Sequence, residues 1–166
     1  EPFFGSGAAG LQLLEHVRES IAVWINDIDY SMYALWHSVL HETRRLIMYV
    51  REFEPTRDAF YELKACDGQP SGCIARDAFQ KIALHRMSVS GFGAKSGGPI
   101  GGKKQGGAYT VGCRWTPASI EQAIYNAKET LMRFSDVRIT NLHFRDVIQD
   151  VTASSVVYLD PPYYVK

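Results

Sequence analysis

The chain has 166 residues, its 18 lysine and arginine side chains balance 18 aspartate and glutamate side chains, and 46% of its residues are hydrophobic. This composition excludes a disordered acidic or basic tail and suits one globular domain of ordinary size. No apolar run approaches the roughly 18 residues that a membrane-spanning helix requires.

The amino-terminal part of the chain predicts a turn, a helix and a strand. The turn is glycine-rich over residues 3–7. Apolar residues then recur at three- and four-residue steps from Leu11 to Ile21, which is the period of an amphipathic helix. Residues 21–27 are mostly apolar and end in an acid, as a buried strand does at its carboxyl end. This succession is typical of half a nucleotide-binding α/β unit.

The middle of the chain is mostly helical. Helical periods run over residues 30–53 and 75–84, and Pro55 favours a new helix start between them. Thr116 and Pro117 suit the cap and the first turn of a further helix, whose apolar residues continue to Leu131.

The carboxyl-terminal part returns to an α/β pattern. Residues 137–142 alternate as a strand does, and a short helix is expected near Val147. Residues 154–159 predict a second apolar strand that ends in an acid. We therefore expect α/β structure at both ends of the chain and a helical, glycine-rich insertion between about residues 34 and 135.

The charge is unevenly distributed along the chain. No acidic residue lies between Asp77 and Glu121, where six lysine and arginine side chains give a local charge of plus six. Nine of the fourteen glycines fall within residues 91–112, and residues 109–115 have the spacing of the return arm of a hairpin. Such a segment is either a solvated loop or a basic element that contacts phosphates, and its composition does not choose between them.

The cysteines predict neither a disulfide framework nor a zinc site. Cys66, Cys73 and Cys113 are odd in number, lack a Cys-x-x-Cys pair and do not have the spacing of a standard zinc site. We expect free thiols in a reducing compartment.

The tetrapeptide Asp160-Pro161-Pro162-Tyr163 follows the last predicted strand and is the most informative motif in the chain. Two successive prolines fix two φ angles and remove two backbone donors, so the local carbonyl groups are rigid. The carboxylate of Asp160 and the carbonyl of Pro161 are two acceptors that suit both N–H bonds of an exocyclic amino group. Tyr163 is placed to stack on the base that carries the amine. A surface turn is the alternative interpretation.

Three segments together resemble the Dam-like family of DNA adenine-N6 methyltransferases. They are Glu1-Pro-Phe-Phe-Gly-Ser-Gly, Ile25-Asn-Asp-Ile-Asp and Val156-Val-Tyr-Leu-Asp-Pro-Pro-Tyr. The resemblance implies the α/β class and a Rossmann-like, S-adenosylmethionine-dependent methyltransferase fold, here with an incomplete sheet. It divides the chain into a partial catalytic domain, residues 1–33 and 136–166, and a mostly helical target-recognition insertion, residues 34–135.

The resemblance also implies that the amino-terminal turn binds the cofactor. This turn would approach the methionine part of S-adenosylmethionine, because its glycines let the backbone come close where a Cβ would clash. The residues concerned are Glu1, Pro2, Phe3, Gly5 and Gly7. Asp27 would hydrogen-bond the ribose hydroxyls, whereas Asp29 is expected to cap the next helix.

The family's next motif ends the third strand and matches His143 and Phe144. Phe144 would contact the adenine of the cofactor, with packing in the core as the alternative. His143 stands where the family has a polar acceptor, and it would either serve in that role or be structural. Asp146 is expected to cap the helix that follows.

In Dam-like enzymes the target-recognition region carries a hairpin that enters DNA, and residues 88–115 occupy its place. The resemblance implies that basic residues in and next to this segment contact phosphates; such contacts position the protein without specifying a sequence. These residues are Arg86, Lys95, Lys103, Lys104 and Arg114. The segment lacks the Asn-Gly-Leu-x-Arg pattern of enzymes that read GATC, so the recognised sequence stays open.

The implied reaction is methyl transfer from S-adenosylmethionine to N6 of an adenine flipped out of duplex DNA, as in restriction–modification. Two alternatives stay open: an N-methyltransferase that acts on RNA or on a protein amide, and a DNA-binding remnant without turnover. We expect a monomer, without a metal ion, in the cytoplasm of a microbial or phage-infected cell.

The chain matches only part of the family's pattern. Most of the first strand and three strands after Tyr164 are not found in it, which would leave two strands without a ladder partner. We therefore expect these residues to be a fragment of a larger enzyme that is inactive and binds cofactor weakly when isolated.

Overall fold

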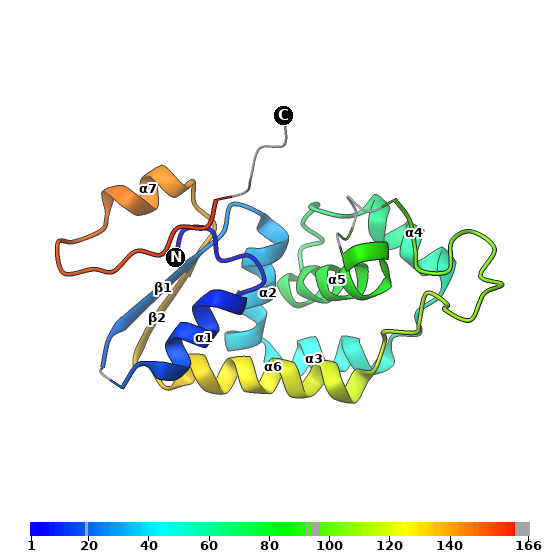
Figure 1. The fold of residues 1–166 in the computed structure, drawn as a ribbon, viewed down its shortest axis with the longest axis horizontal. Helices are drawn as coiled ribbons and strands as arrows, with labels where there is room; N and C mark the ends of the chain where they lie inside the picture. Colours follow the sequence, from blue (N-terminus) through cyan, green and yellow to red (C-terminus); the bar gives the residue numbers. More distant parts are fainter. Residues whose placement is uncertain (19, 92, 94–96, 162–166) are drawn as a thin grey trace.

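The structure is a computed structural model that describes residues 1–18, 20–91, 93 and 97–161. A small parallel sheet lies toward one end of the molecule, and a bundle of helices forms the rest (Figure 1). In chain order the elements are α1 (Ala8–His16), β1 (Ala22–Asn26), α2 (Tyr30–His41), α3 (Thr43–Glu52), α4 (Arg57–Ala65), α5 (Ile74–Met87), the short 3-10 helix η1 (Val89–Gly91), α6 (Pro117–Met132), β2 (Asp136–Thr140) and α7 (Phe144–Gln149). Among the described residues, no helix combines the length and the apolar character needed to cross a membrane.

The sheet of the described residues has two parallel strands, β1 and β2, and the residue Glu1 hydrogen-bonds to the other edge of β1. β2 pairs with one edge of β1, in a register that places Ala22 opposite Asp136. On the other edge, the amino group of Glu1 donates to the carbonyl of Trp24 at 2.7 Å, and the amide of Asn26 donates to the carbonyl of Glu1 at 3.0 Å. This alternation is the hydrogen-bond pattern of a parallel ladder. The mixed α/β class is thus confirmed, while the wider Rossmann-like sheet stays a prediction.

Residues 154–159 do not form the predicted strand. No strand hydrogen bonds join them to any described segment, and the Val156 side chain is 99% exposed. A hollow of about 620 Å³, lined by α1, β1, Val156 and Tyr158, lies between this segment and the sheet. The apolar pattern predicted a strand wrongly because a strand also needs a neighbouring strand to pair with.

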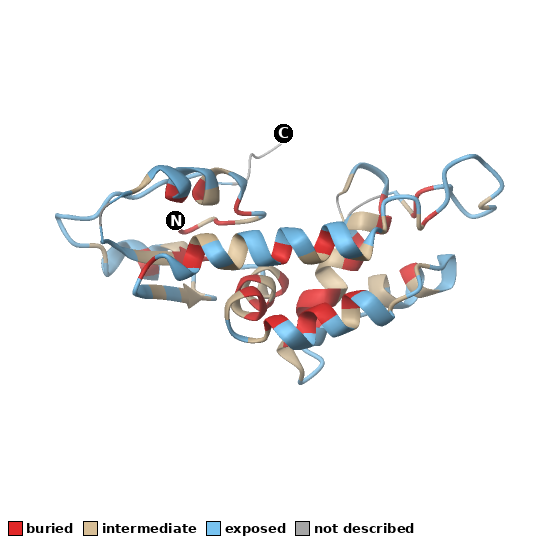
Figure 2. Cartoon of the chain, turned by 90° about the horizontal axis from the view of Figure 1, so that it is seen from below, coloured by how far each residue is buried: buried red, intermediate tan, exposed pale blue. Residues whose placement is uncertain are grey.

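The helical bundle is built around α5. This helix packs against α2, α3 and α4, and its residues Ala78, Ala83 and Leu84 have no exposed surface. The long helix α6 packs across α1, α2 and α3 (Figure 1). The helices bury the faces that they turn toward one another, while the loops at both ends of the molecule are mostly exposed (Figure 2).

The helical period over residues 30–53 corresponds to two helices. Glu42, with φ −119° and ψ 26°, interrupts the period between α2 and α3. The hydroxyl of Thr43 donates to the carbonyl of Val39 at 2.8 Å across this break. The later helix α6 begins as predicted, with Pro117 in its first turn, although the side chain of Thr116 makes no capping hydrogen bond.

The glycine-rich segment contains a shorter hairpin than the sequence predicts. Ser88 and Pro99 form an isolated antiparallel bridge, flanked by a hydrogen bond of 2.8 Å from the amide of Ile100 to the carbonyl of Met87. The predicted return arm over residues 109–115 is not a strand, and residues 111–114 form a turn.

The side chain of Gln105 organises the loop instead. Its Nε2 donates to the carbonyls of Ile100 and Gly102 at 2.8 and 2.6 Å, and its Oε1 accepts from the amide of Val111 at 2.8 Å. The loop ends at Trp115, whose ring packs edge-on against Phe53 of the bundle at 5.0 Å between centroids. Side-chain hydrogen bonds of this kind replace the strand ladder that the spacing suggested.

Candidate active site

The glycine turn and the end of β1 are joined through Asp27. Its Oδ2 accepts from the amide of Gly5 at 2.8 Å, and its Oδ1 accepts from the amide of Asp29 at 2.9 Å. A carboxylate offers about four acceptor positions, so two remain for other donors. Asp29 itself caps α2 by accepting from the amide of Ser31 at 2.9 Å, as the sequence predicts, and it also pairs with Lys81.

The two glycines of the turn have different roles. Gly5 has φ +51°, and a Cβ added there would meet no atom within 4 Å, so the backbone borders open space. Gly7 has φ +73°, and its Cβ would lie 2.5 Å from Cζ2 of Trp36. Gly7 is therefore required by packing inside the protein, and only Gly5 leaves room beside the backbone for a ligand.

A fully buried asparagine fixes the two loops that border the site. Asn26 donates from Nδ2 to the carbonyls of Pro2 and Leu142, both at 3.0 Å. Its Oδ1 accepts from the hydroxyl of Thr140 at 2.8 Å and from the amide of Leu142 at 2.9 Å. The sequence did not predict this role, because the four groups that bond to Asn26 come together only when the two strands pair. The one sign of it in the sequence is an amide side chain at the end of an apolar strand.

The loop after β2 brings an aromatic pair to the site. The rings of Phe3 and Phe144 lie 5.3 Å apart between centroids, and His143 stacks beside Phe144 at 4.6 Å. His143 caps α7, because its Nδ1 accepts from the amide of Arg145 at 3.3 Å. The prediction that Asp146 caps this helix was wrong: Asp146 lies in the first turn, three positions after the cap residue His143.

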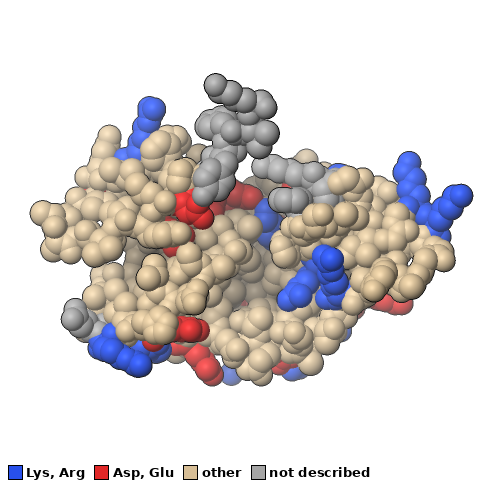
Figure 3. Space-filling view, in the orientation of Figure 1, with Lys and Arg blue, Asp and Glu red and all other residues tan. Residues whose placement is uncertain are grey.

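Asp27 and Asp160 lie within electrostatic range of the Glu1 carboxyl beside the glycine turn. Burial raises the pKa of Glu1 to about 7; its own amino group opposes this rise, whereas Asp160 and Asp27 add to it. Acidic side chains also gather on this part of the surface in Figure 3. Pro161 follows Asp160 on the exposed surface. Pro162 and Tyr163, the other two predicted catalytic residues, lie outside the described residues.

The predicted DNA-contacting residues separate into two groups. Arg86 and Arg114 lie near His85, where burial lowers the pKa of the imidazole and the charges of Arg86, Lys81 and Arg114 lower it further. Lys103 and Lys104 lie instead in the exposed turn of residues 101–104, at an end of the molecule where Figure 3 shows projecting basic side chains. Lys95 lies outside the described residues.

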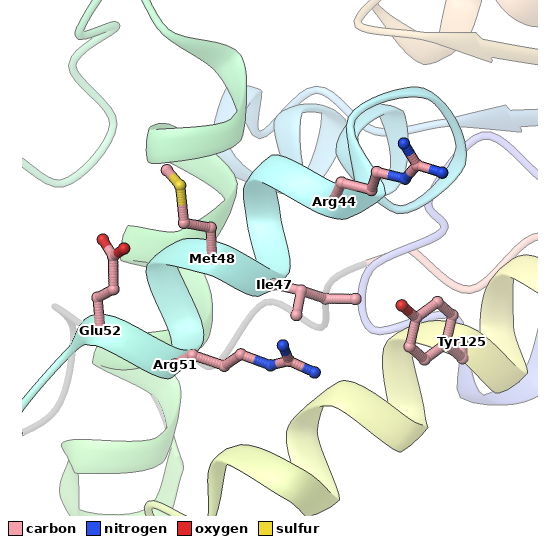
Figure 4. Close-up of a pocket in the computed structure, with 6 residues that line it drawn as sticks. All are labelled: Arg44, Ile47, Met48, Arg51, Glu52 and Tyr125. Atoms are coloured by element: carbon pink, nitrogen blue, oxygen red, sulfur yellow. The ribbon is translucent and has the colours of Figure 1, made fainter.

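A hollow between α3 and α6 contains none of the predicted site residues. It has a volume of about 350 Å³ and is lined by Arg44, Arg51 and Tyr125, among others (Figure 4). Arg51 is held by two hydrogen bonds to Glu121, at 2.9 and 2.6 Å, so its guanidinium is already paired.

The residues at the glycine turn suit a cationic nucleoside. Open space beside Gly5, acceptor positions on Asp27 and the ring of Phe144 match a main-chain contact, ribose hydroxyls and a base. The carboxylates of Glu1 and Asp160 favour positive charge in the same place. S-adenosylmethionine has all of these features, so the residues present fit it.

The sheet, the acidic turn and the basic insertion are the parts expected of a nucleic acid methyltransferase. The family model described as D12 class N6 adenine-specific DNA methyltransferase matches residues 1–165, and the chain belongs to that family. The predicted resemblance is thereby confirmed. DNA adenine methylation is the activity of this family, restriction–modification is consistent with it, and such enzymes generally use S-adenosylmethionine. A comparison with curated proteins gives no match.

Proposed function

We propose that the protein transfers a methyl group from S-adenosylmethionine to N6 of an adenine that is flipped out of duplex DNA. The observation that carries this proposal is the meeting of three separate segments at one end of the sheet. Gly5 borders open space and hydrogen-bonds to Asp27, Phe3 of the turn packs against Phe144, and Asp160 comes within electrostatic range of Glu1. In open parallel sheets, ligands bind at the carboxyl ends of the strands.

In this proposal the turn and the strand ends hold the cofactor. Asp27, kept in place by the amides of Gly5 and Asp29, accepts from the ribose hydroxyls. Phe144, packed against Phe3, contacts the adenine ring of the cofactor. Its exposed neighbour His143 is already used as a helix cap, so a structural role is favoured for it. Bound S-adenosylmethionine supplies a methyl group on a positively charged sulfur.

The motif at the end of the chain holds the target base. The carboxylate of Asp160 and the carbonyl of Pro161 accept both N–H bonds of the adenine amino group, which orients the nitrogen lone pair. Tyr163 stacks on the flipped ring, and Pro162 keeps the intervening backbone rigid. A base inside a duplex cannot present its amino group to such a site, so flipping at a cost of a few kcal/mol is part of the proposal.

The insertion holds the DNA. Residues 34–135 form the target-recognition part of the proposed enzyme, and residues 1–33 with 136–166 form the catalytic part. Exposed Lys103, Lys104 and Arg114 contact phosphates, together with Arg86 and Lys95. Because these contacts set orientation and affinity without reading bases, they leave the recognised sequence to other side chains.

A methylation assay on matched substrates tests this proposal. The complete gene product is incubated with S-adenosylmethionine and with duplex DNA, RNA or a protein extract, and the products are digested and analysed by mass spectrometry. We expect N6-methyladenine in the DNA alone. Methylated RNA or protein without methylated DNA would overturn the proposal, and salt-dependent DNA binding without any methyl transfer would support the non-catalytic alternative.

A further inference from the structure

A groove runs between α5 and α6 and is bordered by α2. It has a volume of about 250 Å³, and its apolar lining includes Trp36 from α2, Ile82 from α5 and Ile124 from α6. Ser6 of the glycine turn belongs to the same lining. The groove therefore leads from the candidate active site into the helical insertion.

The basic side chains of this groove come from one helix. Lys81, His85 and Arg86 of α5 line it, and no acidic side chain is among the described residues of its lining. Lys81 is paired with Asp29 at 2.7 Å, whereas Arg86 forms no ion pair within the described part of the chain. Arg114 adds a further positive charge near His85. The groove therefore combines apolar walls with an excess of positive charge on one side.

We propose that this groove holds the sugar–phosphate backbone of the DNA strand that carries the target adenine, with a phosphate at Arg86 and His85. The inference rests on the proposed function and deepens it by naming where that strand lies. Its support is charge complementarity: Arg86 and Arg114, which form no ion pair within the described residues, attract a polyanion, and an apolar wall suits the carbon face of a deoxyribose. Because Ser6 of the glycine turn lines the same groove, a strand that lies in the groove reaches the active site.

His85 gives the proposal a second signature. Burial lowers the pKa of the His85 imidazole, and the charges of Arg86, Lys81 and Arg114 lower it further. Gly91, with φ +71°, holds the backbone against the ring, since a Cβ there would lie 3.1 Å from Nε2. The groove residues of α2 and α6 are not titratable. Within the described part of the chain, the acid that an ion pair links to this cluster is Asp29, through Lys81.

A phosphate beside His85 raises the pKa of the imidazole again. Its negative charge favours the protonated imidazole, so the protein takes up a proton when DNA enters the groove. Affinity for DNA therefore rises as the pH falls from 8 to 6, by a factor of about 3 to 10.

The test measures the binding of a fluorescein-labelled duplex DNA of two helical turns to the complete gene product by anisotropy. We expect Arg86→Gln to weaken binding and to reduce the slope of log K against log salt by about 0.9, the value for one phosphate contact. His85→Gln should remove the pH dependence while leaving binding at pH 8 nearly unchanged. Arg44→Gln, in the separate hollow of Figure 4, is the matched control and should leave the pH dependence intact.

The outcomes separate this inference from the proposed function. If wild-type protein methylates DNA but Arg86→Gln and His85→Gln bind it with unchanged salt slope and pH dependence, the groove does not hold the strand and the inference fails alone. If wild-type protein neither binds nor methylates duplex DNA, the proposed function fails first. Thermal unfolding of both variants shows whether they fold. If Arg86→Gln does not fold, the pH dependence of DNA binding by His85→Gln still decides the inference.

Discussion

Substituting Asn26 by aspartate tests whether this buried amide fixes the loops of the active site. Asn26→Asp keeps the shape of the side chain but replaces its donor by an acceptor. The new oxygen then faces the carbonyls of Pro2 and Leu142, which both accept from Nδ2 in the wild-type protein. Acceptors would oppose acceptors in a place where Asn26 has no exposed surface.

The expected loss follows from the number of groups left unpaired. Each buried polar group without a partner costs about 1–3 kcal/mol, so two carbonyls give a loss of about 2–6 kcal/mol in the free energy of unfolding. This is a large share of the roughly 5–15 kcal/mol that stabilises a domain. Protonation of the new carboxyl restores one donor, so the loss should be smaller at pH 5 than at pH 8.

Asn141→Asp is the matched control. Asn141 also donates from Nδ2 to two carbonyls, those of Asp27 and Ile28 at 2.7 and 3.0 Å, but it is exposed. Water can replace these bonds, so we expect a loss of about 1 kcal/mol or less. Urea unfolding of both variants, followed by circular dichroism, measures the difference. Equal losses in the two variants would refute the role given to Asn26.

Two further predictions concern the cofactor. Because the pKa of Glu1 is raised to about 7, its carboxyl gains charge as the pH rises through 7, and affinity for cationic S-adenosylmethionine should increase from pH 6 to pH 8. Calorimetry on Glu1→Gln should show this increase reduced, and an unchanged pH profile would contradict the electrostatic role of Glu1. Gly5→Ala should weaken cofactor binding with a loss of only about 1–2 kcal/mol in stability, since its methyl group enters open space. Gly7→Ala should instead lower the free energy of unfolding by about 2–5 kcal/mol, because its Cβ meets Trp36. If urea unfolding shows a larger loss for Gly5→Ala than for Gly7→Ala, the roles given to the two glycines are wrong.

The elements set by local pattern were predictable from the sequence. The strands β1 and β2 and the helices around α5 and α6 lie where apolar periods and a proline start place them. These signals are local, since a period of 3.6 or 2 identifies the face that a segment buries. The cap of α7 was misplaced because His143 and Asp146 are both able to cap, and the choice depends on where the helix begins.

The elements that depend on distant partners were not predictable. Residues 154–159 have the composition of a strand but no strand beside them, and the loop after α5 is organised by Gln105 rather than by a hairpin ladder. For the site, the resemblance assigned the glycine turn and Asp27 to the same cofactor, and in the structure a hydrogen bond from Gly5 to Asp27 joins them. The hydrogen bonds of the Asn26 side chain could not be predicted, because its partners lie up to 116 residues away in the chain.

The most direct test of the proposed site is methyl transfer by Asp160→Ala. The complete gene product, this variant and the control Asp150→Ala, which alters an exposed carboxylate at the end of α7, are compared for N6-methyladenine formed in duplex DNA and for S-adenosylmethionine binding by calorimetry. We predict that Asp160→Ala loses transfer by a factor of at least about 100 while cofactor affinity stays within about threefold, since a removed transition-state contact lowers turnover rather than binding. Transfer by Asp160→Ala at near the wild-type rate would contradict the assignment of this carboxylate to the target adenine.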